Sequence, residues 1–179
     1  MGLSDSTVSL GVPLADALTS LQLEFVPHMT LALGESVWLG LPGFSLSRDP
    51  LGDSSGGYTT VDLDGHSSDS FRATWENATE ERPYESVRLR VTSAVTALAP
   101  VALTIAASAG TSTSSGALRV PALGLRMCDG PPGVGDGGKI AKECLSLSTD
   151  AAAGPVPIPV PVEQAPAVGS FGRSSTVQW

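Results

Sequence analysis

The sequence predicts an all-β protein: a two-sheet antiparallel β-sandwich, Ig-like or jelly-roll, with an extended Pro-rich C-terminal strand or tail. Short stretches in which apolar and polar residues alternate recur along the 179-residue chain, with turn signals between them. The composition, with 20 Gly, 14 Pro and only 16% charged residues, is typical of a β-rich surface protein rather than of a cytosolic enzyme. Alternation and composition together favour many short strands over helices.

The stretch 21–44, with the sequence LQLEFVPHMTLALGESVWLGLPGF, gives the clearest strand signals. Leu21–Phe25 alternates apolar and polar residues, and Val37–Leu41 forms a second apolar row. Pro42-Gly43 is a turn signal that we expect to direct Phe44 into the core. We therefore expect two strands of a β-sheet here, closed by a Pro-Gly turn.

Further short strands are expected before and after this pair. Each has apolar residues at alternate positions, or a short apolar run, between turn residues. They cover residues 4–10, 58–63, 71–76, 87–91, 101–106, 118–120, 123–127 and 144–147. A helix at 138–147 is the competing interpretation, and it is too short and too close to glycines to change the fold class.

The composition changes at residue 151, so we predict a β-sandwich domain at 1–154 and a Pro-rich segment with a C-terminal strand at 155–179. Within 155–162, prolines occupy every second position. Such prolines remove the N–H groups from one edge of an extended strand and leave the other edge free to pair. A stiff polyproline spacer fits the same composition and stays open as the alternative.

The last residues include three apolar side chains that are unusual in a disordered tail, Phe171, Val177 and Trp179. An apolar strand after a Pro-rich segment is what a chain needs if it completes the sheet of a neighbouring unit. The same strand can also fold back onto its own domain. Both interpretations, a donated strand and an intramolecular last strand, stay open.

Two cysteines, Cys128 and Cys144, flank a loop rich in Gly and Pro. Outside the cell a disulfide between them would close this loop, worth roughly 3 kcal/mol in the chain-entropy model. In a reducing compartment they would be two buried thiols. We favour the disulfide, because the loop DGPPGVGDGG cannot order itself by burial.

Charge and hydropathy narrow the classes of partner. The net charge is −8 with only 10 Lys and Arg, which leaves no basic field for a phosphate backbone, so nucleic acid is not expected. No stretch approaches the ~18 apolar residues of a membrane span. No signal peptide is visible, although Gly2 and Ser6 fit the loose myristoylation pattern; the signal of a secreted protein would lie upstream or have been removed.

We recognise no catalytic, metal-binding or cofactor motif and predict that the protein is not an enzyme. The two histidines, His28 and His66, stand beside no Ser or Cys nucleophile in a known pattern. The run 133–139 has the form of a phosphate-binding loop, but Ile140 occupies the place of the metal-binding Ser or Thr. The acidic stretch 62–69 has ligand oxygens that calcium tolerates, yet its spacing fits no EF-hand.

Several residues are candidates for covalent sugar. Asn77-Ala78-Thr79 is an N-glycosylation sequon in a polar turn just past a strand. The Pro-rich segment is a candidate for O-linked sugar on hydroxylated prolines, as in algal or plant secretory chemistry. These prolines are Pro155, Pro157, Pro159 and Pro161. Both predictions agree with an extracellular or cell-surface location.

The stretch 21–44 also resembles a module of very large secreted or cell-surface repeat proteins of microalgae and related protists. In that module a strand, a Pro, Leu-x-x-Gly, a second strand and Leu-Pro-Gly-Phe follow one another. The matching residues are Leu21, Leu23, Phe25, Pro27, Leu33, Gly34, Val37, Leu39, Leu41, Pro42, Gly43 and Phe44. The resemblance covers roughly residues 6–127 and implies a β-sandwich unit of a fibrous extracellular protein without assigned catalytic residues.

We therefore expect an extracellular structural protein that polymerises head to tail into a glycosylated filament by β-strand donation. Its partners would be neighbouring copies of the same chain and covalent glycans. The alternative is a carbohydrate- or surface-binding β-sandwich module that uses exposed aromatic side chains such as Trp38, Tyr58 or Tyr84.

Overall fold

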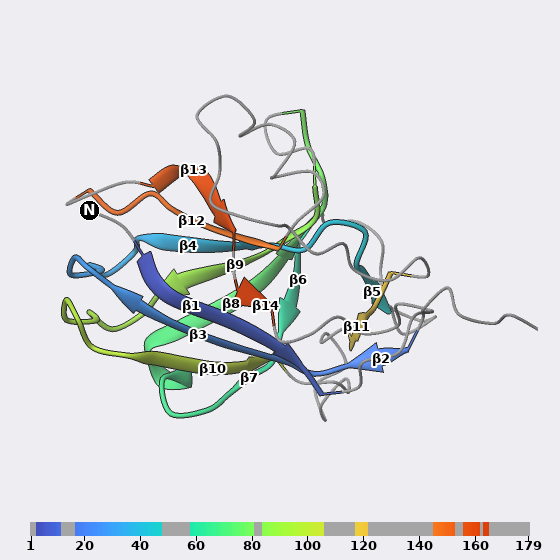
Figure 1. Ribbon diagram of the computed structural model, residues 1–179, viewed down its shortest axis with the longest axis horizontal. Helices are drawn as coiled ribbons and strands as arrows, with labels where there is room; N and C mark the ends of the chain where they lie inside the picture. Colours follow the sequence, from blue (N-terminus) through green and yellow to red (C-terminus); the bar gives the residue numbers. More distant parts are fainter. Residues whose placement is uncertain are drawn as a thin grey trace, which may run out of the picture.

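The computed structural model describes residues 3–11, 17–47, 58–80, 84–105, 117–121, 145–152, 156–161 and 163–164. Within these residues the regular secondary structure is almost entirely strand (Figure 1), and the one helical element is the single 3-10 turn η1 (Ser68–Ser70). The predicted all-β class is confirmed.

One sheet is built around β3 and is called the β3 sheet. Its strands follow the order β14-β1-β3-β10-β7. They are β1 (Leu3–Leu10), β3 (Leu21–Pro27), β7 (Leu63–Asp64), β10 (Val101–Ile105) and β14 (Glu163–Gln164). Neighbouring strands are antiparallel, except that β14 runs parallel to β1.

A second sheet, called the β4 sheet, is antiparallel throughout and has the order β13-β12-β4-β9-β8-β6. Its strands are β4 (Ser36–Gly40), β6 (Tyr58–Val61), β8 (Phe71–Glu76), β9 (Ser86–Val91), β12 (Ser146–Thr149) and β13 (Val156–Pro161). A small third sheet has the order β2-β11-β5. It consists of β2 (Leu18–Thr19), β5 (Ser45–Ser47) and β11 (Ala117–Arg119).

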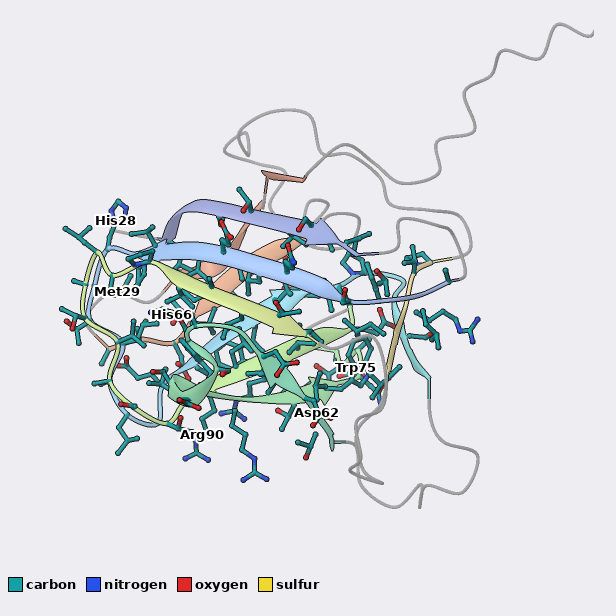
Figure 2. All side chains as sticks on the ribbon, turned by 90° about the horizontal axis from the view of Figure 1, so that it is seen from below. His28, Met29, Asp62, His66, Trp75 and Arg90 are labelled. Carbon is teal, nitrogen blue, oxygen red and sulfur yellow. The ribbon has the colours of Figure 1, made fainter. Side chains whose placement is uncertain are left out.

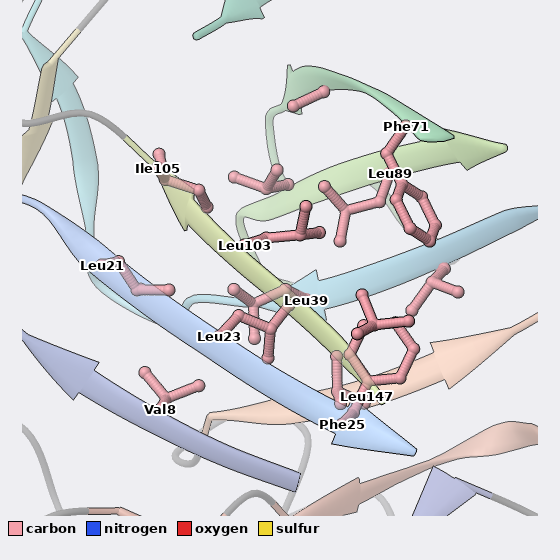
Figure 3. Close-up of a cluster of buried hydrophobic side chains, with 14 of the residues drawn as sticks. Val8, Leu21, Leu23, Phe25, Leu39, Phe71, Leu89, Leu103, Ile105 and Leu147 are labelled. Carbon is pink, nitrogen blue, oxygen red and sulfur yellow. The ribbon is translucent and has the colours of Figure 1, made fainter. Parts of the chain in front are cut away.

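One hydrophobic core takes side chains from both the β3 sheet and the β4 sheet (Figure 2). Figure 3 shows Leu23 and Leu103 of the β3 sheet close to Leu39 of the β4 sheet. Phe25 on β3 meets Phe71 on β8 edge to face, with 6.4 Å between the ring centroids. Each sheet thus turns its apolar residues toward the same core, as the alternation along its strands requires.

The stretch 21–44 departs from expectation in one respect. Both strands form and Phe44 is buried, but β3 and β4 do not pair, because each lies in a different sheet. The connection between them buries Met29 and Leu31, and Leu31 forms a bridge with Val95. Apolar and polar residues alternate in the same way whether two strands pair within one sheet or face each other across a core from two sheets. The sequence pattern therefore did not distinguish these two arrangements.

The Pro-rich segment forms a paired strand. β13 is antiparallel to β12, with Val160 opposite Leu147, and it ends the β4 sheet. Residues 163–164 then pair with β1 of the other sheet. The sequence left two interpretations open, a paired strand and a polyproline spacer. Residues 156–161 form the strand.

The core makes a testable prediction. Leu39→Ala should lower the free energy of unfolding by about 3 kcal/mol, because it removes buried methyl groups and leaves a cavity. Leu39 is fully buried, whereas Leu33 is 72% exposed. Leu33→Ala makes the same chemical change at the surface and should shift stability by less than about 0.5 kcal/mol. Urea denaturation measures both, and equal destabilisation would contradict this position of the core.

Candidate functional site

The backbone groups at the edges of the two sheets determine where a further strand can add. The β4 sheet ends in β13, in which Pro157, Pro159 and Pro161 alternate with Val and Ile. Alternate residues of a strand direct their N–H groups to opposite edges, and proline has none. The strand can pair with β12 through the N–H groups of its Val and Ile residues, and the proline positions then give the outer edge no donors. This edge is closed to another strand.

Ser67 closes the β10 edge of the β3 sheet. The N–H of Ser67 donates to the Ala102 carbonyl oxygen, and the Ser67 hydroxyl accepts from the Ala102 N–H, both at 3.2 Å. Gly65 permits this close approach: its φ is +107°, and a Cβ there would lie 3.0 Å from the Ala102 carbonyl oxygen. Farther along β10, β7 pairs with Thr104 and Ile105. The outer groups of β10 at these positions are thus already bonded.

β1 forms the edge at the other side of the β3 sheet. β14 pairs with it only at Thr7 and Val8, although β1 is 8 residues long. In the described part of the chain no strand lies beside the rest of β1 on this side. The other end strands of the described sheets are shorter: β6 has 4 residues, β5 has 3, and β2, β7 and β14 have 2 each. β1 is therefore the longest edge in the described residues that could accept a further strand.

The outer face of the β4 sheet carries a connected group of side chains from β4, β8 and β9, which we call the Trp38 cluster: Trp38, Glu76 and Arg88. The Trp38 indole N–H donates to Glu76 Oε2 at 3.0 Å, and Arg88 Nη1 lies 3.6 Å from Glu76 Oε1. The Arg88 guanidinium carbon is 5.4 Å from the centroid of the Trp38 ring. Arg88 Nε also donates to Ser36 Oγ at 3.0 Å. These contacts fix the orientation of the indole.

Tyr84 packs beside this cluster over Gly40. A Cβ at Gly40 would lie 2.9 Å from Tyr84 Cε2 and 2.6 Å from Ser146 Oγ, so only glycine fits there. Tyr84 is 6% exposed, and it therefore does not offer the exposed aromatic surface expected for a carbohydrate site. Ser86 stands opposite Gly40 and is 1% exposed. Within the described residues its hydroxyl has no hydrogen-bond partner.

The sequon follows directly after β8. Asn77 is exposed, and its Oδ1 accepts a hydrogen bond of 3.0 Å from the indole N–H of Trp75. Trp75 itself is 4% exposed and belongs to the core. The core tryptophan thus holds the amide oxygen and leaves Nδ2, the atom to which an N-glycan is attached, as the outer amide atom.

The acidic stretch and the histidines do not assemble into a site. Asp62 and Asp69 line a shallow hollow together with Arg72. Among the described residues, no group of three His, Cys, Asp or Glu side chains could hold a metal ion. His28 and His66 are exposed on separate connections of the chain (Figure 2).

Several predicted site residues lie outside the described residues. They are Cys128, Cys144, Pro155, Phe171, Val177, Trp179, the phosphate-loop-like run 133–139, the expected strand 123–127 and the expected strand position 144. The other candidate prolines, Pro157, Pro159 and Pro161, lie in β13. The Trp38 cluster and the role of Ser67 were not predicted, because they join residues far apart in the sequence.

The buried Ser86 hydroxyl predicts the direction in which a substitution changes the free energy of unfolding. Ser86→Ala should leave the free energy of unfolding unchanged or raise it by up to about 1 kcal/mol, because it removes a buried hydroxyl without a partner. Ser36→Ala is the matched control and should lower stability by about 1 kcal/mol, since Ser36 Oγ accepts from Arg88. Thermal unfolding of both variants checks this, and a similar loss in both would be inconsistent with an unpaired Ser86.

Comparison of the chain with protein-family models, with curated proteins and with solved structures gives no match. The resemblance of residues 21–44 to a module of secreted algal repeat proteins therefore stays a prediction. Within the described residues, no helix is long and apolar enough to cross a membrane.

Proposed function

We propose that this protein is an extracellular structural protein that polymerises head to tail into a glycosylated filament by β-strand donation. Its unit is a two-sheet β-sandwich of the Ig-like or jelly-roll type. The core that takes side chains from both the β3 sheet and the β4 sheet supports this architecture. The observation that carries the functional proposal is the difference between the closed edges at β13 and β10 and the largely open edge at β1.

Strand addition needs an edge with unpaired backbone groups, because main-chain hydrogen bonds supply the affinity. Proline removes the donors along β13, and Ser67 already bonds to β10. Within the described residues, β1 has no neighbour on the side away from β3 beyond Thr7 and Val8. An incoming segment that pairs with β1 would continue the β3 sheet.

The proposed donor is the segment 165–179 of a neighbouring copy. It follows β14, which already runs beside β1 of its own chain. Val177 and Trp179 are two residues apart, so in an extended strand both face the same side while Gln178 faces the other. This alternation suits a strand with one side on a core and one side in water. The resemblance to fibrous repeat proteins points in the same direction.

Removing the donor should abolish filaments. Full-length protein is expected to form filaments in negative-stain electron microscopy. A chain that ends at Gln164 should give single particles, because it keeps every described strand but lacks the segment 165–179. A synthetic peptide of residues 165–179 should bind to the truncated protein and inhibit growth of full-length filaments.

Point variants test the same proposal in the full chain. Replacing Phe171, Val177 and Trp179 together by Ser should prevent filament formation, because the donated strand loses its apolar side. The matched control changes the polar neighbours Ser170, Ser174 and Ser175 to Ala and should still polymerise. Filaments that persist without the three apolar residues, or single particles of the unaltered chain, would refute strand donation by this segment.

The filament is proposed to carry an N-glycan at Asn77. When the protein is made in a eukaryotic secretory pathway, peptide-N-glycosidase should lower its mass. Asn77→Gln and Thr79→Ala should each abolish that change, because glycan transfer needs both residues of the sequon. Glu80→Ala lies next to the sequon and should leave the glycan in place. A glycan that persists in Thr79→Ala would contradict the assignment.

A further inference from the structure

Three arginines gather on the outer face of the β4 sheet, in a protein whose net charge is −8. Arg72 on β8 stands directly opposite Arg90 on β9, and Arg88 lies two residues before Arg90 on the same face. They are three of the four Lys and Arg side chains among the described residues, the fourth being Arg119 on β11.

Two of these arginines lack an acidic partner. Arg72 and Arg90 are exposed, and the described part of the chain offers neither of them an ion pair or hydrogen bond. Figure 2 shows Arg90 extending away from the ribbon of the sheet. Like charges directly opposite each other on paired strands destabilise a sheet. Glu76 already bonds to Trp38 and Arg88. Asp62 and Asp69 line a hollow beside Arg72, but within the described residues neither forms an ion pair with it.

The Trp38 cluster continues this face along the sheet. Trp38 stands opposite Arg88, and its partly exposed indole is oriented by Glu76 and Arg88. A fixed aromatic ring offers an apolar surface to the C–H groups of a sugar ring. A guanidinium binds carboxylate or sulfate through two parallel hydrogen bonds. Because Trp38 and Arg88 are already held by these contacts, little ordering entropy is lost when they bind a ligand.

The spacing favours an extended ligand with repeated negative charges. Paired strands lie roughly 4.8 Å apart, and residues two apart in one strand lie roughly 7 Å apart. An array with this spacing can contact several negative groups of one extended chain at the same time. We propose that this face, with Arg72, Arg88, Arg90 and Trp38, binds an acidic polysaccharide.

This proposal does not depend on filament formation, and it is tested with the full chain. Binding to immobilised polygalacturonate, dextran sulfate and neutral dextran is measured by biolayer interferometry at about 50 mM NaCl and again at about 300 mM, where surface charges are screened. The native chain should bind one or both acidic polymers at low salt, lose most of this binding at high salt and not bind dextran.

Single arginine variants distinguish binding at this face from attraction by the net charge of the protein. Arg90→Gln should weaken binding about tenfold and Arg72→Gln with Arg90→Gln about a hundredfold, because each removes a charge-assisted contact. Arg119→Gln changes the net charge by the same amount as Arg90→Gln and should stay within about twofold, since it lies on a different sheet. Urea denaturation confirms that each variant is folded.

Three results would overturn the proposal. The first is that neither acidic polymer binds at low salt. The second is that Arg119→Gln weakens binding as much as Arg90→Gln, which would mean that only net charge matters. The third is that the variant with both Arg72→Gln and Arg90→Gln no longer self-associates in sedimentation velocity but binds the polysaccharide as before. That result would assign this face to a second copy of the chain.

Discussion

Leu23 of β3, Leu39 of β4 and Leu89 of β9 belong to one core, and none of the three side chains has exposed surface. Burial of such side chains is the main favourable contribution to folding, so this contact sets the positions of both sheets. Side chains alternate along a strand, and the same burial therefore turns Trp38 and Arg88 to the outer face. The polar cluster there is a consequence of how the core packs.

The edges of the sheets follow a second constraint, the need of each backbone N–H and C=O group for a partner. β13 removes its outer donors with proline, and β10 has its outer groups bonded by Ser67. Two different local solutions thus protect two edges from unwanted pairing. In the part of the chain that the structure describes, a strand covers the edge at β1 along Thr7 and Val8 and no farther, and this contrast underlies the proposed strand donation.

Prediction from sequence succeeded where a feature is local. The strands β8 and β9 lie close to the predicted boundaries, because their alternation depends only on residues next to one another. The accessible position of Asn77 was also predicted, since it follows a strand in a polar turn. The burial of Tyr84 was missed, because Tyr84 packs over Gly40 of β4, which lies far from it in the sequence.

The sequence by itself determined the all-β class, the positions of most described strands and the side of each strand that turns inward, because these depend on short-range alternation. Only the tertiary structure decided that β3 and β4 belong to different sheets, and that Arg72 stands opposite Arg90. Partner choice and register come from packing between distant segments. No pattern within a single segment encodes which strand lies beside it.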